Sequence, residues 1–184
     1  MRPQNFVTID INQGGGGLSR PIIAGALLRV LHGVFKENEN KYAIAIPDHG
    51  FGWVRVFAGS REDLDLLHEN IKGNQVVKDY CRFGYPQAVP EGFSGPWKRY
   101  SRFRIPSRNA ERNENGTVRM RRIEKAENEQ LPYFIVRSKS NGQGFSLHVK
   151  IETSSGPQKL NECEPNSYGL SVTTRPFALP DLSG

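Results

Sequence analysis

The spacing of apolar residues predicts a βαββαβ order of elements in the first half of the chain. Apolar residues alternate with polar ones in the predicted strands and recur every three to four positions in the predicted helices. The predicted elements are strands at 6–12, 42–46, 53–58 and 76–82, a helix from Ser19 to Lys36, and a helix that begins at Ser60. This order is that of the ferredoxin-like (RRM-like) arrangement. The aromatic pattern with which such sheets often bind RNA is absent from the predicted inner strands.

The second half predicts a small antiparallel sheet and an arginine-rich helix. The predicted elements are a linker at 86–96, a strand at 97–105, an irregular segment at 108–116, a helix at 117–130, a hairpin of 131–138 and 144–152 around Asn141-Gly142, and a short strand near 168–173. The fold class is therefore α+β, with a ferredoxin-like domain at 1–92 and a C-terminal domain at 93–184. A degenerate ferredoxin-like unit is one interpretation of the second domain.

The positive charge of the chain is concentrated in one segment. The formal net charge is +6, and residues 98–125 carry +7, with ten basic and three acidic side chains, which leaves −1 for the remainder. Trp97, Tyr100 and Phe103 are interleaved with the basic residues at the beginning of this segment. A charge run is often only a solvated face, but this density of basic and aromatic residues favours a nucleic-acid partner.

The composition argues against several other classes of protein. Hydrophobic residues make up 36% of the chain, enough for a core, but no apolar run is long enough for a membrane span, and no secretory signal is visible. Cys81 and Cys163 are far apart, so neither a disulfide framework nor a structural zinc site is expected. We expect a protein of a reducing, cytoplasmic compartment, with no cofactor, no metal site and no membrane partner.

Two features of the sequence are candidates for chemistry. His32 lies at the rim of the apolar face of the first helix, beside Leu28 and Phe35. An imidazole there can act on a bound phosphodiester or simply complete the edge of the core, and the pattern alone favours the second interpretation. The turn at 137–145 gathers hydroxyls, amides and a cation, as either a phosphate cradle or an ordinary hairpin turn would. The sequence has no Ser-His-Asp spacing, paired carboxylates or Walker loop.

The hairpin segment resembles a known family. Its sequence from Leu131 to Phe145, LPYFIVRSKSNGQGF, followed by Tyr168-Gly169-Leu170-Ser171, closely resembles the C-terminal motifs of the CRISPR-associated endoribonuclease of type I-F systems. Leu31-His32 and Ser101-Arg102 match as well, and the similarity spans nearly the whole chain in order and length. That family cuts precursor CRISPR RNA within its repeats.

The resemblance implies a metal-independent endoribonuclease that binds the stem-loop of CRISPR repeat RNA. The 2′-hydroxyl of the RNA attacks the adjacent phosphorus, and the enzyme stays bound to the hairpin of the mature guide RNA within the type I-F surveillance complex. By resemblance, His32 is the catalytic histidine, Ser138 positions the 2′-hydroxyl, and Tyr168 orients the imidazole. The implied RNA-binding residues are Arg102 and Arg104 on a strand, Arg119, Arg121 and Arg122 on the helix, Ser140 and Asn141 in a phosphate pocket, and Phe145, which stacks on a nucleotide.

The chain departs from the family pattern at Arg104, where glutamine is common, and at Asn141, where threonine is usual. Its arginine-rich helix is also shorter, because residues 113–116 interrupt it. Two other functions stay open from the sequence. One is a non-catalytic RNA-binding subunit of a ribonucleoprotein, which would need neither His32 nor Ser138, and the other is a ribosome-associated or regulatory module.

Overall fold

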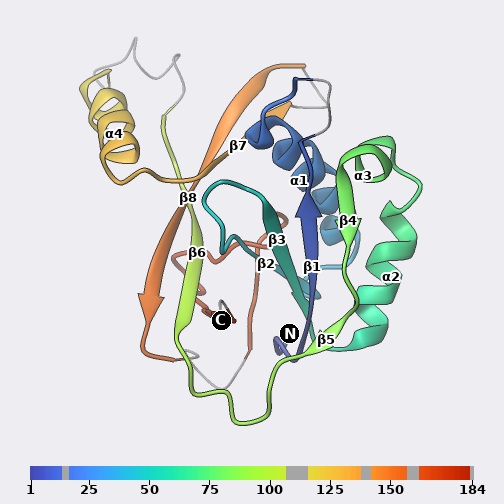
Figure 1. Cartoon of the computed structure of the whole chain (residues 1–184). Coiled ribbons are helices and arrows are strands. Elements are labelled where there is room, and N and C mark those ends of the chain that lie inside the picture. The colour runs from blue at the N-terminus through green and yellow to red at the C-terminus, as the bar shows by residue number, and fades with distance from the viewer. Residues whose placement is uncertain (14–16, 107–115, 138–141, 157–161, 183–184) are drawn as a thin grey trace.

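The computed structural model describes residues 1–13, 17–106, 116–137, 142–156 and 162–182. In these ranges the chain forms two β-sheets, of five and four strands, and four helices. Helices α1, α2 and α3 lie together beside the first sheet, whereas α4 lies apart from them at the second sheet (Figure 1). None of the described helices is both long enough and apolar enough to cross a membrane. The predicted α+β class is confirmed.

The first sheet has the strand order β2-β3-β1-β4, and β5 also pairs with β1. The elements of this half are β1 (Asn5–Ile11), α1 (Arg20–Glu37), β2 (Tyr42–Ala45), β3 (Trp53–Ala58), α2 (Arg61–Ile71), α3 (Gln75–Tyr80), β4 (Cys81–Phe83) and β5 (Gln87–Ala88). The described pairings in this sheet are antiparallel. Val7, Ile9 and Ile11 are buried, which confirms the alternation predicted for the first strand.

The second sheet has the strand order β7-β8-β6-β9. The elements of this half are β6 (Trp97–Phe103), α4 (Gly116–Asn128), β7 (Tyr133–Arg137), β8 (Gly144–Ser154) and β9 (Leu179–Pro180). When the strands of each half are counted along the chain, both sheets follow the order second, third, first, fourth. The second half is therefore a degenerate ferredoxin-like unit, in which the described residues between β8 and β9 form no second helix.

Helix α1 packs against both sheets and contributes much of a shared core. Its buried residues are Ile23, Ala24, Gly25, Leu27, Leu28, Leu31 and Phe35. The helix approaches the second sheet closely at Gly25, where an added Cβ would lie 1.9 Å from the carbonyl oxygen of Ile135 in β7. Only glycine allows the two backbones to approach so closely. Pro21 and Tyr133 line the same cavity, so α1 and β7 run side by side in the same direction.

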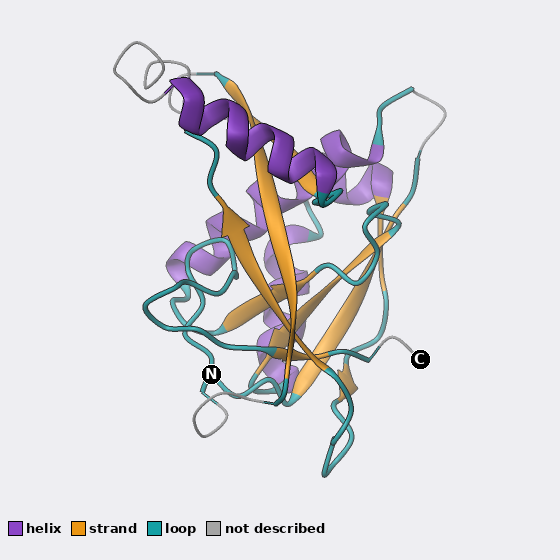
Figure 2. Ribbon diagram, turned by 90° about the vertical axis from the view of Figure 1, so that its left-hand side faces the viewer, coloured by secondary structure: helices purple, strands orange, loops and turns teal. Residues whose placement is uncertain are grey.

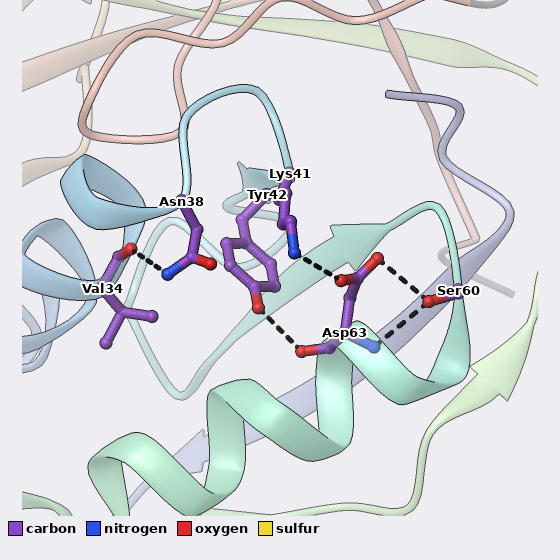
Figure 3. A network of polar contacts seen from close by, with 6 residues as sticks. All are labelled: Val34, Asn38, Lys41, Tyr42, Ser60 and Asp63. Carbon is purple, nitrogen blue, oxygen red and sulfur yellow. Dashed lines mark hydrogen bonds and ion pairs between the residues drawn. The ribbon is translucent and has the colours of Figure 1, made fainter.

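Polar contacts fix the segment after α1 to the first turn of α2. The residues of this network are Val34, Asn38, Lys41, Tyr42, Ser60 and Asp63 (Figure 3). Ser60 accepts a hydrogen bond from the backbone of Asp63 and caps α2, while the Asp63 carboxylate pairs with Lys41 at 3.3 Å. The Tyr42 hydroxyl donates to the Asp63 carbonyl at 2.8 Å. Burial, together with the nearby Asp63 charge, raises the pKa of Tyr42 to about 12, so this hydroxyl remains a donor at neutral pH.

The strand predicted at 76–82 is wrong over most of its length. Residues 75–80 form α3, and only Cys81–Phe83 pair with β1 as β4. The Asn74 side chain caps α3 by accepting a hydrogen bond from the backbone amide of Val76 at 3.0 Å. Within α3 only Val77 is buried, so the segment lacks an alternating apolar face, and the local cap outweighs the β propensity of the two valines.

Two predictions for the loops also differ from the structure. Within the predicted linker at 86–96, Gln87–Ala88 pair with β1 and belong to the first sheet. The strand predicted near 168–173 is wrong, because Gly169 has a φ of +76°, a left-handed conformation that ends any extended run. Ser171 makes only an isolated bridge to Ser101 of β6, and the fourth strand of the second sheet is β9.

Candidate active site and RNA interface

His32 lies at the rim of the apolar face of α1, as predicted, and contacts a segment distant in the sequence. It is half-buried, and its neighbours Leu31 and Phe35 are buried. Its Nδ1 lies 2.6 Å from the carbonyl oxygen of Ser167. Its ring stacks on that of Tyr168, with centroids 4.3 Å apart and planes inclined by 12°. The fold therefore brings two of the predicted catalytic residues, His32 and Tyr168, into direct contact.

A tight turn at residues 166–170 presents both partners of His32. The Asn166 side-chain oxygen accepts hydrogen bonds from the backbone amides of Tyr168, at 2.8 Å, and Leu170, at 3.1 Å. An asparagine that accepts from the amide two residues later closes the backbone into a turn. The backbone closes the same turn, since the Asn166 amide donates to the Leu170 carbonyl at 2.9 Å.

The same segment connects the first sheet to β6. The Gly169 carbonyl accepts a hydrogen bond from the Ile44 amide at 2.9 Å, and a Cβ on Gly169 would lie 3.0 Å from that nitrogen. Two residues later, the Ser171 amide donates to the Tyr100 carbonyl in β6 at 2.9 Å. The segment that holds His32 is thereby attached to the strand that carries Arg102.

Arg102 and Phe145 lie close together on the adjacent strands β6 and β8. The guanidinium carbon of Arg102 is 5.8 Å from the centroid of the Phe145 ring, within the range of a cation–π contact. Arg102 is exposed and Phe145 is half-buried. Tyr100 shares its face of β6 with Arg102 but is buried, and this burial raises the pKa of Tyr100. On this face, the exposed residues are Arg102 and, just beyond the strand, Arg104, whereas Lys98 is half-buried.

The predicted arginine-rich helix is α4, which crosses the upper part of the view in Figure 2. Ala126 is buried, and most of the other side chains of α4 are exposed. The guanidinium carbon of Arg122 lies 5.0 Å from the centroid of the Phe103 ring, and Arg119 is half-buried. Arg122 therefore contacts a residue of β6, although it is exposed, as Arg121 is.

Acidic residues neutralise the beginning of the basic segment. Lys98 pairs with Asp181 at 2.7 Å, and the Asp181 side chain is only 8% exposed. A hydrogen bond from Lys150, together with nearby positive charges that include Arg99, lowers the pKa of Glu152. Among the described residues of the basic segment, the exposed arginines without an acidic partner at ion-pair distance are Arg102, Arg104, Arg121 and Arg122. The uncompensated positive charge of this segment therefore lies at the end of β6 and on α4.

Three predicted site residues lie outside the described residues, namely Ser138, Ser140 and Asn141. The strand that precedes them, β7, runs along α1 with Ile135 against Gly25. His32 is seven residues beyond Gly25, about 10 Å at the rise of an α-helix. Arg137, the last residue of β7, is two residues beyond Ile135, about 7 Å at the rise of a strand. The end of β7 therefore approaches the level of His32.

The other histidines lie away from this site. His49 and His68 are exposed, and His68 stacks on Phe83 with centroids 4.8 Å apart. His148 and Tyr133 line a cavity of about 300 Å³ at the end of α4, and partial burial lowers the pKa of His148. In the part of the chain that the structure describes, no three His, Cys, Asp or Glu side chains are grouped so that they could hold a metal ion.

Sequence reasoning missed the Ser167 carbonyl and the Asn166 side chain. The sequence does carry a signal for a turn here, because asparagine followed three residues later by glycine is typical of turns. No local pattern, however, links this turn to a histidine 135 residues away from Ser167. The contact becomes visible only when both halves are folded together.

Comparison with known proteins identifies the family. The profile of the family described as CRISPR-associated protein (Cas_Csy4) matches residues 13–180, which include α1 and the second sheet. No curated protein matches the chain significantly. The family match confirms the resemblance drawn from the motifs and, with it, a nuclease function in the processing of CRISPR repeat RNA. The chain belongs to the Csy4 family of CRISPR-associated proteins, the repeat-processing proteins of type I-F systems.

Proposed function

We propose that the protein is a metal-independent endoribonuclease that binds the stem-loop of the CRISPR repeat and cuts precursor CRISPR RNA into guide RNA. The 2′-hydroxyl oxygen forms a bond to the adjacent phosphorus, and the bond from that phosphorus to the 5′-oxygen of the next nucleotide breaks. The products are a 2′,3′-cyclic phosphate and a 5′-hydroxyl. One proton leaves the 2′-hydroxyl and one is added to the leaving oxygen, so the reaction needs a group that exchanges protons near neutral pH.

The contact between His32 and the 166–170 turn is the observation that carries this proposal. A histidine that only completes the edge of a core needs no fixed ring orientation. Here the Ser167 carbonyl and the Tyr168 ring restrict both the rotation and the plane of the imidazole. A half-exposed imidazole in a fixed orientation suits proton transfer to and from a bound substrate. We therefore propose that His32 transfers protons and that Tyr168 keeps the His32 ring in its orientation.

We assign Ser138 the task of positioning the 2′-hydroxyl. Ser138 follows Arg137 directly in the sequence, and the approach of β7 to the level of His32 supports this assignment. Ser140 and Asn141 belong to the same hairpin connection and are proposed to contact the phosphate. Holding the 2′-oxygen, the phosphorus and the leaving oxygen in line supplies much of the rate enhancement in reactions of this kind.

Two groups of arginines are proposed to hold the RNA. Arg102 and Arg104 would read base edges low in the stem, since a guanidinium can bond to two acceptors of guanine, and Phe145 would stack on a nucleotide near the cut. The proposed groove contacts on α4 are Arg119, Arg121 and Arg122. Because such charged contacts persist after cleavage, the protein would remain on the hairpin product, as a subunit of the type I-F surveillance complex alongside its backbone and other subunits.

The chemistry of the product ends tests the proposed function. A precursor RNA with one repeat is incubated with the protein, and the fragments are labelled with and without prior phosphatase treatment. We expect a single cut, a 5′ fragment whose end resists phosphatase until mild acid opens a cyclic phosphate, and a 3′ fragment that polynucleotide kinase labels directly. A 3′-hydroxyl and a 5′-phosphate at the cut would contradict attack by the 2′-hydroxyl. Binding without any fragments would favour a non-catalytic RNA-binding subunit.

Tyr168→Ala is expected to lower the single-turnover cleavage rate about fivefold, because a stacked aromatic pair contributes about 1 kcal/mol to fixing the imidazole. Tyr168→Phe keeps the ring that stacks on His32. We expect its rate to stay within about threefold of the parent rate. Single-turnover kinetics at saturating protein measure both variants. Equal losses in the two variants would show that the hydroxyl, and not the stacked ring, supports the reaction.

Arg121→Ala is expected to weaken hairpin binding and to reduce the slope of log Kd against log salt concentration by about 1, the value for one lost phosphate contact. Lys98→Ala is the matched control. Lys98 belongs to the same basic segment, but Asp181 already neutralises it. Filter binding from low to high salt should therefore leave the slope of Lys98→Ala unchanged. An unchanged slope for Arg121→Ala would remove α4 from the proposed RNA interface.

A further inference from the structure

We propose that Asn166 is a positioning residue for His32 and that it fixes the tautomer of the imidazole. This inference rests on the proposed function and deepens it. The Asn166 side chain does not touch His32 in any described contact and acts through the turn that it closes. Its hydrogen bonds determine where the Ser167 carbonyl and the Tyr168 ring lie, and these two groups contact the imidazole.

The Ser167 carbonyl decides which ring nitrogen of His32 carries a proton. A carbonyl oxygen only accepts hydrogen bonds, so Nδ1, at 2.6 Å from it, must be the donor. In the neutral ring, Nε2 is then the nitrogen with the free electron pair. Histidine in water favours the other tautomer, with the proton on Nε2, so the contact with Ser167 selects the less common form. Proton exchange with the RNA would accordingly run through Nε2.

Asn166 is the side chain that holds the Ser167 carbonyl in place. Ser167 itself is exposed, so packing does little to fix its position. The Asn166 oxygen binds the amides of Tyr168 and Leu170, which lie just beyond Ser167. On the other side of the turn, Gly169 is tied to the backbone of Ile44. Loss of the Asn166 acceptor would loosen the Ser167 peptide, while the backbone hydrogen bonds of the turn and the attachment to Ile44 remain.

The experiment compares the parent protein with Asn166→Ala, Asn166→Asp and Asn74→Ala. Asn166→Ala removes the acceptor, and Asn166→Asp keeps an oxygen at the same position. Asn74→Ala removes a side-chain acceptor of the same kind, since Asn74 accepts from the amide of Val76 at the start of α3. Two-bond proton–nitrogen correlation spectra of histidine-labelled protein report the tautomer, and single-turnover cleavage and hairpin Kd are measured in parallel. Thermal unfolding shows which variants remain folded.

We expect the parent spectrum to show His32 protonated on Nδ1. In Asn166→Ala the signal should move toward the Nε2-protonated form, and the cleavage rate should fall about tenfold with an unchanged hairpin Kd. Asn166→Asp should restore the tautomer and most of the rate, and Asn74→Ala should change neither. A parent spectrum with the proton on Nε2, or a tautomer shift without loss of rate, would overturn the proposal. If the parent protein does not cleave RNA at all, the proposed function fails, while the spectra still decide whether Asn166 sets the tautomer.

Discussion

Replacing His32 by alanine is expected to slow RNA cleavage by about a hundredfold to ten-thousandfold, the range for loss of a general acid–base group. The imidazole is the group that the Ser167 carbonyl and the Tyr168 ring hold in a fixed orientation. Hairpin binding should change by less than about threefold, because a neutral side chain contributes little to phosphate affinity. Single-turnover cleavage of a labelled repeat hairpin, together with filter binding, measures both effects.

His68→Ala is the matched control for this substitution. His68 is an exposed histidine that stacks on Phe83, away from the contact between His32 and the 166–170 turn. Its replacement should leave both cleavage and binding at the parent level. Cleavage by His32→Ala at the parent rate would remove His32 from the mechanism. A large loss of binding in that variant would instead point to a role in holding the RNA.

Gly25→Ala is expected to lower the free energy of unfolding by about 3 kcal/mol, at the upper end of the usual range for overpacking. The added methyl group would lie 1.9 Å from the carbonyl oxygen of Ile135 and 2.5 Å from its carbonyl carbon, and a backbone cannot turn away as a flexible side chain can. Helix α1 would have to move off β7, the strand that ends near the level of His32. Urea denaturation followed by circular dichroism measures the change.

Gly33→Ala is the control in the same helix. An added Cβ at Gly33 meets no atom within 4 Å, so only the helix propensity changes. Alanine is about 1 kcal/mol more favourable than glycine in a helix interior, and Gly33→Ala should stabilise the protein by about that amount. Equal unfolding free energies for the two variants would contradict the close packing of α1 against β7.

Local signals in the sequence were sufficient for most of the first half. The start of α1 follows from Ser19 and Pro21. The start of α2 follows from Ser60 and from the acidic residues that come after it in the first turn. In contrast, the two valines of α3 favour a strand by their β propensity, whereas the structure forms a helix there that the Asn74 side chain caps. The division of the chain into domains at residue 92 stays a prediction, since buried residues of both halves form one continuous core.

The candidate site, like the fold, could be predicted only in part from the sequence. The position of His32 at the rim of α1 followed from helical spacing, and the motif around Tyr168 followed from the family resemblance. Their contact could not be predicted from local patterns, because it depends on a turn that Gly169 attaches to Ile44. In the sequence, the basic segment is a single region of excess positive charge. Its charge is in fact divided by tertiary contacts, since Asp181, far along the chain, neutralises Lys98.

Cleavage of the repeat hairpin in excess EDTA is the most direct test of a metal-independent reaction that uses the RNA's own 2′-hydroxyl. An end-labelled hairpin is incubated with the protein, and the same hairpin is made with a single 2′-deoxynucleotide immediately 5′ of the cut. We predict one cut at the same rate with and without EDTA, and no cut in the deoxy-substituted RNA. Cleavage that stops in EDTA and returns with added divalent ions, or that continues in the deoxy-substituted RNA, would contradict the proposed mechanism.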